Sequence, residues 1–203
     1  YWVCAVALCK LGATIIPASL QLTKKDIVYR ADSARVKAVV CVNDEYVCGQ
    51  MEEALPESPS IENRIIVAGE RDGWTPFDEL IEGESGEFER PTGEGGVTSK
   101  DIMLVYFTSG TTGLAKAVCH NFAHPLGHII TAKYWQQVEE DTLHMSVTDS
   151  GWAKFGWGKI YGQWIAGATI FAYDMDKFVP TKLLQKIQDY KLTTFCAPPT
   201  MYR

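Results

Sequence analysis

Short apolar runs alternate with helical segments along this 203-residue chain, and this alternation narrows the possible folds more than any other feature. Strands are expected at 13–18, 38–42, 65–67, 102–107, 142–147, 168–173 and 193–197, and helices at 1–11, 23–34, 77–81, 123–138, 158–166 and 181–190. Several strand segments are continuous and rich in β-branched residues, which is typical of parallel strands buried on both faces. The sequence therefore predicts an α/β fold with a mostly parallel sheet flanked by helices.

The charge of the chain disfavours binding to nucleic acid. The net charge is −6 and the pI is about 5.2, whereas neutralising phosphates needs a basic surface. Fifteen acidic residues and only three arginines lie between positions 43 and 94, so we expect this segment as an acidic surface excursion. The rest of the chain carries 16 basic and 10 acidic residues, and this balance would suit an anionic ligand such as a nucleotide.

The six cysteines form no Cys-x-x-Cys pair and mostly lie in apolar runs, which indicates reduced core residues of a cytoplasmic protein. The longest uninterrupted apolar stretch, Val3–Cys9, has seven residues and is too short to span a bilayer. The first residues do not resemble a signal peptide, and both ends have the character of interior segments. We therefore expect a fragment of a longer protein, whose exposed apolar surface would favour a homo-oligomer.

The most informative segment for function is a run of small residues directly after the expected strand at 102–107. Glycine lets backbone N–H groups turn toward an anion, hydroxyls add donors and a lysine adds positive charge, so such a run can hold a polyphosphate. The spacing Gly110-x-x-Gly113-x-x-Lys116 disfavours a P-loop of the Walker type. The candidate phosphate-binding residues are Thr108, Ser109, Gly110, Thr111, Thr112, Gly113 and Lys116.

The run from Tyr106 to Lys116 resembles the phosphate-binding motif of AMP-forming acyl-CoA synthetases and their adenylating relatives. That family usually has proline before the lysine, where this chain has Ala115. The resemblance covers essentially the whole chain, because other segments are similar in the same order. They are Leu11-Gly12-Ala13…Pro17, Asp149-Ser150-Gly151-Trp152 and Ala197-Pro198-Pro199-Thr200-Met201-Tyr202-Arg203, the last of which resembles medium-chain acyl-CoA synthetases.

The resemblance implies an acid–thiol ligase whose small molecules are a short- or medium-chain carboxylic acid, ATP, Mg²⁺ and CoA. A carboxylate attacks the α-phosphorus of ATP to give acyl-AMP and pyrophosphate, and the CoA thiol then displaces AMP. By the same resemblance, the loop at 108–113 holds the β- and γ-phosphates with the help of Lys116, which stabilises charge without covalent chemistry. The Mg²⁺ ion would bridge phosphate oxygens.

The resemblance also implies that residues 1–203 are a fragment of the large N-terminal AMP-binding domain. The family's magnesium-binding glutamate, its ribose-binding aspartate and its C-terminal domain with the catalytic lysine have no counterpart in this sequence. We therefore expect no catalytic residue of the family in this chain, and no adenylation by the chain alone.

Candidates for the acyl pocket lie in a segment where aromatic residues and glycines are interleaved, 151–164. Glycines beside flat rings leave room for an apolar acyl group, although aromatic residues also commonly form packed core. The candidates are Trp152, Phe155, Trp157 and, from the end of the motif, His120. The spacing of His120, His124 and His128 raises the question of a metal site, but no carboxylate or cysteine is spaced to join them. No metal site is expected.

Two other interpretations stay open. An adenylation domain that charges a carrier protein, or an aryl-CoA ligase, would keep the fold and change the acid or the acceptor. A non-catalytic nucleotide-binding module could instead use the acidic segment 43–94 as a partner surface.

Overall fold

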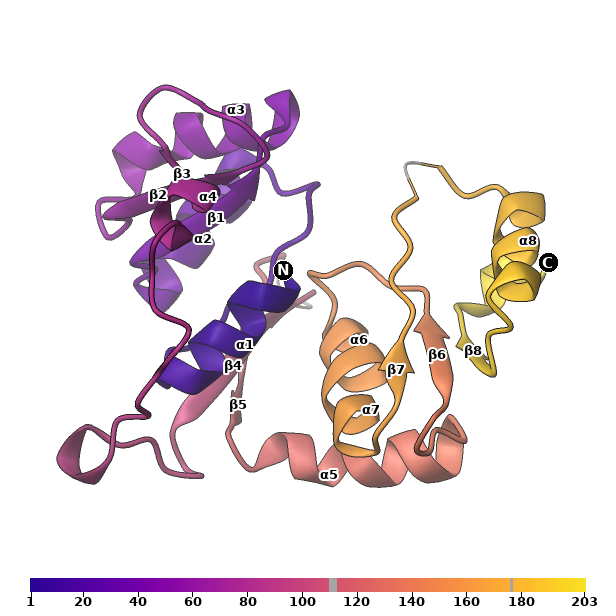
Figure 1. The fold of residues 1–203 in the computed structure, drawn as a ribbon. Helices are drawn as coiled ribbons and strands as arrows, with labels where there is room; N and C mark the ends of the chain where they lie inside the picture. Colours follow the sequence, from indigo (N-terminus) through magenta and orange to yellow (C-terminus); the bar gives the residue numbers. More distant parts are fainter. Residues whose placement is uncertain (110–112, 176) are drawn as a thin grey trace. The chain divides into compact units, whose positions relative to one another are not determined.

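A computed structural model describes residues 1–109, 113–175 and 177–203. The chain forms two compact units (Figure 1). The first unit comprises Tyr1–Pro17, Val97–Tyr106 and Val118–Arg203, and the second comprises Ala18–Gly96 and Phe107–Ala117.

The second unit is built on a small parallel sheet in the order β1-β2-β3, with Cys41 paired to Ile66. Its core consists of Cys41, Cys48, Ile66 and Trp74. The elements are α2 (Lys24–Ala34), β1 (Ala38–Val42), α3 (Glu45–Ala54), η1 (Leu55–Glu57), β2 (Asn63–Val67), β3 (Thr75–Pro76), α4 (Phe77–Ile81) and η2 (Gly93–Gly95).

The start of α2 follows the local rule expected from its sequence. The backbone N–H of Thr23 donates to Asp26 Oδ2 at 3.1 Å, and the Thr23 side chain accepts from the N3 backbone, which completes a capping box. Ile27 is buried on the inner face of the helix. The hydrogen bonds with Thr23, first that of its side chain, lower the pKa of Asp26 despite some desolvation.

The first unit contains a second parallel sheet in the order β7-β6-β8, while β4 and β5 pair as a two-stranded sheet. A continuous helical run from 153 to 165 includes a π-helical turn, and a second π-helical turn extends α5. The elements are α1 (Trp2–Leu11), β4 (Ile102–Thr108), β5 (Lys116–Asn121), α5 (His124–Ile130), η3 (Thr131–Trp135), β6 (Leu143–Ser146), α6 (Ala153–Phe155), η4 (Gly156–Ile160), α7 (Tyr161–Ile165), β7 (Thr169–Ile170), α8 (Pro180–Asp189), β8 (Thr194–Cys196) and η5 (Pro199–Tyr202).

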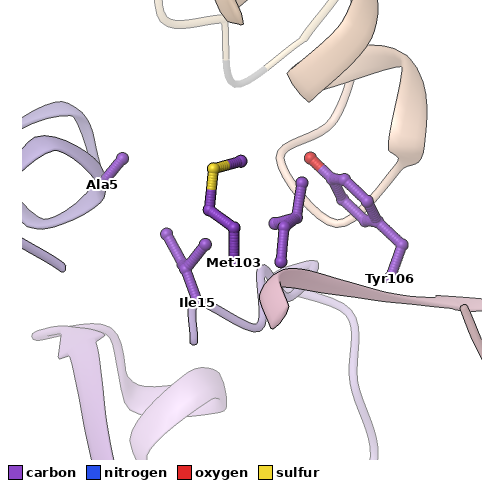
Figure 2. Packing of buried hydrophobic residues seen from close by; sticks show 5 residues of the cluster. Ala5, Ile15, Met103 and Tyr106 are labelled. Atoms are coloured by element: carbon purple, nitrogen blue, oxygen red, sulfur yellow. The ribbon is translucent and has the colours of Figure 1, made fainter. Parts of the chain in front are cut away.

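The main core of the first unit lies between α1 and β4. Figure 2 shows Ile15 beside Met103, Ala5 approaching from α1, and the ring of Tyr106 extending from β4. Ile15 pairs with Leu104 as a single parallel bridge. The helix α1 ends at Gly12, whose left-handed conformation (φ 76°) lets its N–H bond to the carbonyls of the last turn.

The α/β class and the parallel pairing of strands are confirmed, but the expected single sheet is divided into three. The expected strand at 13–18 is only the bridge at Ile15, and the one at 168–173 shrinks to Thr169–Ile170. β1 is not buried on both faces, because Val40 and Val42 are exposed. A continuous β-branched run therefore predicts a strand correctly without showing how many of its faces are covered.

The segment 43–94 is more structured than a surface excursion, because α3 and β2 form part of the core of the second unit. The Arg71 guanidinium binds the Glu52 carboxylate through Nε at 2.6 Å and Nη2 at 3.0 Å. Trp74 Nε1 donates to the same carboxylate at 3.1 Å. These bonds, that of Arg71 first, lower the pKa of Glu52. Only the later part, from about 82 to 95, is exposed along nearly its whole length.

The cysteines of the chain are free thiols, as expected, although they are not all core residues: Cys41 and Cys48 are buried and Cys119 is exposed. Within the described residues, no helix is both long enough and apolar enough to cross a membrane.

Close packing of α5 and α7 depends on Gly162. A Cβ atom at this position would overlap the backbone of His128, with the carbonyl carbon at 2.8 Å. Backbone cannot move aside cheaply, so we expect Gly162→Ala to lower the free energy of unfolding by about 1–3 kcal/mol, as overpacking does. Urea unfolding monitored by circular dichroism would measure this change.

Gly127→Ala is the matched control for that substitution. Gly127 lies on α5 itself, and a Cβ atom there would meet nothing within 4 Å. Alanine is the better helix former, so we expect this variant to be unchanged or slightly more stable. Equal stability of the two variants would contradict the tight α5–α7 contact.

Candidate functional site

The candidate phosphate-binding loop connects β4 to β5. Thr108 is the last residue of β4 and Lys116 the first of β5, and both are exposed, as are Ser109 and Gly113. Gly113 has φ 88°, a conformation that favours glycine, and none of the described residues has an atom within 4 Å of where a Cβ at Gly113 would be. The other three candidates, Gly110, Thr111 and Thr112, lie outside the described residues. The described ends of the loop therefore leave hydroxyl, backbone and ammonium donors open to an anion.

One helix of the second unit holds both ends of this loop. The Tyr29 hydroxyl on α2 donates to the carbonyl oxygen of Ala115 at 2.8 Å, just after the loop. Just before it, Phe107 meets the edge of the Tyr29 ring at a centroid distance of 6.2 Å. The Arg30 guanidinium lies 5.0 Å from the centroid of the Phe107 ring, and burial lowers the pKa of Arg30. The loop thus starts and ends at fixed points.

In the first unit, the side chain of Trp157 is the centre of an aromatic cluster. The His128 ring stacks on it almost in parallel, at an interplanar angle of 8° and a centroid distance of 4.6 Å. The other rings meet it at larger angles, at centroid distances between 4.5 and 6.4 Å. The rings in contact with Trp157 are those of Tyr106, His120, His124, His128 and Tyr161. We call these six residues the Trp157 cluster.

Hydrogen bonds orient the rings of His124 and His128 in the Trp157 cluster. The Thr131 hydroxyl donates to the His128 carbonyl at 2.9 Å, so it accepts from His128 Nδ1–H at 3.1 Å. His128 Nε2 is then an acceptor, and His124 Nε2–H donates to it at 3.3 Å. Desolvation, and then the neighbouring histidines, lowers the pKa of His120 and that of His128. Both rings are therefore neutral at pH 7.

The flat faces of aromatic rings can pack against an apolar group. A metal site has a different requirement, namely several ligand atoms that converge on one point. Among the residues that the structure describes, no group of three or more His, Cys, Asp or Glu side chains is arranged to hold a metal ion. We assign no metal to the histidines.

The structure brings together two of the four acyl-pocket candidates, Trp157 and His120. Phe155 is buried elsewhere, with its ring 4.7 Å from that of Tyr1 and 5.6 Å from that of Trp2. Trp152 is 58% exposed and follows a turn in which the Gly151 N–H donates to Asp149 Oδ1 at 2.7 Å. The Asp-x-Gly-Trp segment therefore forms a local turn that opens the helical run at Ala153.

His144, which binds the turn that carries Trp157, is a fully buried neutral histidine. Its Nε2–H donates to the Gly158 carbonyl at 3.1 Å, so its Nδ1 accepts from the Thr194 hydroxyl at 2.8 Å. Desolvation is the main cause that lowers the pKa of His144. The ring is therefore held in one tautomer between β6, β8 and the π-helical turn.

These lowered pKa values predict a loss of stability in mild acid. An unfolded histidine, with a pKa near 6.5, binds a proton at higher pH than His144 does in the folded chain. The free energy of unfolding is therefore undiminished above about pH 6.5 and falls as the pH drops from there toward the lowered folded pKa. Urea unfolding at pH 7.5 and pH 5.5 would measure the fall, and His144→Gln should make it smaller. An unchanged difference in that variant would contradict the assignment to His144.

Comparison with known proteins decides the family. The family described as AMP-binding enzyme matches residues 1–203. The chain belongs to the AMP-binding enzyme family. This result confirms the family resemblance that the sequence of the loop between β4 and β5 indicates.

Curated relatives of this AMP-binding enzyme are acyl-coenzyme A synthetases. The rat mitochondrial protein ACSM4 (Rattus norvegicus) is 32% identical over 206 residues, and ACSM3 of Pongo abelii, also named as mitochondrial, is 29% identical over 205. Each alignment covers 100% of this chain but only 34% of the relative. The chain thus spans about a third of the length of these relatives.

Solved structures confirm the fold of this AMP-binding enzyme. Acetoacetyl-CoA synthetase from Streptomyces lividans matches 98% of the chain with a TM-score of 0.83 at 17% identity, over 32% of its own length. The acyl-CoA synthetase of Brucella canis matches 98% with a TM-score of 0.82 at 19% identity, over 35% of its length. At such low identity these matches establish the fold alone.

Sequence reasoning missed four members of the Trp157 cluster: Tyr106, His124, His128 and Tyr161. Two spacings contained a signal, since His124 and His128 are four residues apart, as are Trp157 and Tyr161. His120 is on β5, whereas His124 and His128 are on α5. Tyr106 gave no signal, because its role depends on which helix covers β4.

Proposed function

We propose that this AMP-binding enzyme chain is part of a longer AMP-forming acyl-CoA synthetase. The protein activates a short- or medium-chain carboxylic acid with ATP and transfers the acyl group to CoA. A carboxylate oxygen attacks the α-phosphorus, and the bond from that phosphorus to the bridging oxygen breaks, releasing pyrophosphate. The CoA sulfur then attacks the acyl carbon, the thiol proton is lost, and AMP leaves.

The observation that carries this proposal is the exposed, donor-rich loop whose two ends are held by α2, in a chain of this family. Lys116 and the open backbone at Gly113 bind the β- and γ-phosphates, together with Thr108 and Ser109 and with residues 110–112. Such groups stabilise charge at the leaving pyrophosphate and take no part in covalent chemistry. The catalytic lysine of the proposed enzyme lies outside this chain.

The acyl group is assigned to the Trp157 cluster. Neutral His120 and half-buried Trp157 form an apolar wall there, so a short or medium hydrocarbon chain can displace water from it. Trp152 and Phe155, which lie apart from this cluster, are given no role in the proposal. Their role in the acyl pocket stays a prediction from the sequence. The cytoplasmic location also stays a prediction, because the mammalian relatives are named as mitochondrial.

In this proposal Mg²⁺ binds together with ATP and is given no separate site on this chain. A protein-held Mg²⁺ needs carboxylate or carbonyl oxygens converging on one point, and the described residues provide no such group of carboxylates. This part of the chain therefore does not fit a resident metal ion, and we assign no step to one.

The test is ATP–pyrophosphate exchange by the full-length protein, with carboxylic acids from acetate to decanoate and with branched, aromatic and amino acids. We expect exchange to peak at short or medium aliphatic acids, followed by release of AMP when CoA is added. A peak at aryl or amino acids would replace the substrate class, and no exchange with any acid would overturn the proposal. The 203-residue chain alone should form no acyl-AMP.

A further inference from the structure

The π-helical turn that carries Trp157, Gly156–Ile160, is held by buried side chains from outside it. A π-turn interrupts the regular hydrogen-bond ladder of a helix, and such turns are often found at functional sites. Its first N–H, that of Gly156, donates to the Tyr106 hydroxyl at 3.1 Å. Burial is the main reason that the pKa of this hydroxyl rises to about 12, so it stays protonated.

Two glutamines supply much of the remaining support. Gln136 Nε2 donates to the Gly158 carbonyl at 2.9 Å, and the same oxygen accepts from His144. Gln163 Nε2 donates to the Trp157 carbonyl at 3.3 Å and to the side-chain oxygen of Gln136. The two amides therefore bind each other as well as the backbone on either side of the Trp157–Gly158 peptide bond.

Gln136 also links this turn to the helix that carries two of the histidines. It directly follows the π-turn Thr131–Trp135, which extends α5, and its backbone N–H donates to the Thr131 carbonyl at 3.1 Å. Thr131 in turn binds the ring of His128. A single pair of amides thus fixes the turn of Trp157 and the helix end beside His128 relative to each other.

Among the described residues, the side-chain amide of Gln163 has hydrogen-bond partners on its NH2 side only. The residue is fully buried, and within the part of the chain that the structure describes its Oε1 atom has no hydrogen-bond partner. A buried acceptor without a partner costs free energy, whereas an apolar side chain of similar shape would avoid that cost.

We propose that Gln136 and Gln163 are positioning residues that hold the Trp157 ring in place against the histidine rings, and through that position set the chain length of the acid that is accepted. This inference rests on the proposed acyl-CoA synthetase function and deepens it. A small shift of the Trp157 turn would move the apolar wall, whereas the loop proposed to bind phosphate belongs to the other unit.

The test uses Gln163→Met in the full-length enzyme. Methionine keeps the length of the side chain and removes both donated hydrogen bonds. We expect the ratio of kcat/KM for octanoate to that for butyrate to change about tenfold, since small misplacements at a binding site have large effects on rate. The KM for ATP should stay within about twofold of its original value. Gln185→Met, on the exposed face of α8, is the matched control and should change neither quantity.

A double-mutant cycle with Gln136→Met tests whether the two glutamines act together or independently of each other. If the pair acts as one unit, the double variant changes the acid ratio no more than Gln163→Met alone. Because Gln136 is only half-buried, Gln136→Met also serves if Gln163→Met does not fold. Folded variants that keep the original acid ratio would overturn the inference while leaving the proposed function intact. Absence of exchange in the unmodified enzyme would instead overturn the proposed function.

Discussion

Replacing Lys116 with methionine should lower ATP–pyrophosphate exchange by the full-length enzyme about 100-fold, the cost of removing one charge-stabilising group from a reacting site. Lys116 is exposed at the start of β5, and the structure records no ion pair for it among the described residues, so the substitution should not affect folding. Methionine keeps the length of the side chain and removes only the ammonium group.

The kinetic pattern distinguishes phosphate binding from other roles of this lysine. Because the β- and γ-phosphates leave as pyrophosphate, we expect the loss in kcat/KM for ATP to exceed any change in KM for the acid. Lys182→Met, on the exposed surface of α8, is the control for loss of one positive charge. Exchange by the Lys116→Met variant within threefold of the unmodified enzyme would remove Lys116 from the proposed site.

Replacing Trp157 with alanine should shift the preferred acid to a longer chain. Removing the indole opens space beside the three histidine rings, and each methylene in an apolar pocket changes discrimination by roughly 10-fold or more. We therefore expect the ratio of kcat/KM for decanoate to that for butyrate to rise about 10- to 100-fold. Exchange assays over the same series of acids would measure it.

Trp135→Ala is the matched control for that experiment. Trp135 is 64% exposed and lies on the same helical segment as His124 and His128, in the π-turn after α5. Its replacement should leave the acid ratio unchanged. Thermal unfolding of both variants must accompany the kinetics, because the half-buried Trp157 also contributes to packing. An unchanged acid ratio in a folded Trp157→Ala enzyme would place the acyl group elsewhere.

Features that depend on a few neighbouring residues could be predicted from the sequence. The end of α1 at Gly12 and the capping box at Thr23 and Asp26 follow from local rules. Pro125 and Pro180 lie in the first turns of α5 and α8, where proline is tolerated. The candidate phosphate-binding loop, whose role stays a prediction, was likewise visible as a continuous run after a strand. These features need no knowledge of what packs against them.

Features that depend on packing were predicted only in part. The helix expected at 158–166 begins at Ala153, and its π-turn breaks the regular period, so Trp152, Phe155 and Trp157 point to different surroundings. Their proximity in sequence gave no means of choosing among them. The grouping of His120 with His124 and His128 also required the turn between β5 and α5, since only that turn brings a strand residue beside the helix.

The hydrogen bond between Tyr29 and Ala115 bears on the presence of alanine where the family usually has proline. Proline, the residue that the family usually has here, limits backbone freedom through its ring, and alanine lacks that limit. In this chain the Tyr29 hydroxyl holds the carbonyl of Ala115 at 2.8 Å and restrains the same residue from outside. The proline ring restrains the backbone at this position through covalent bonds, whereas in this chain a tertiary hydrogen bond from Tyr29 restrains it. Conformational entropy at this position is thus tied to the folding of α2.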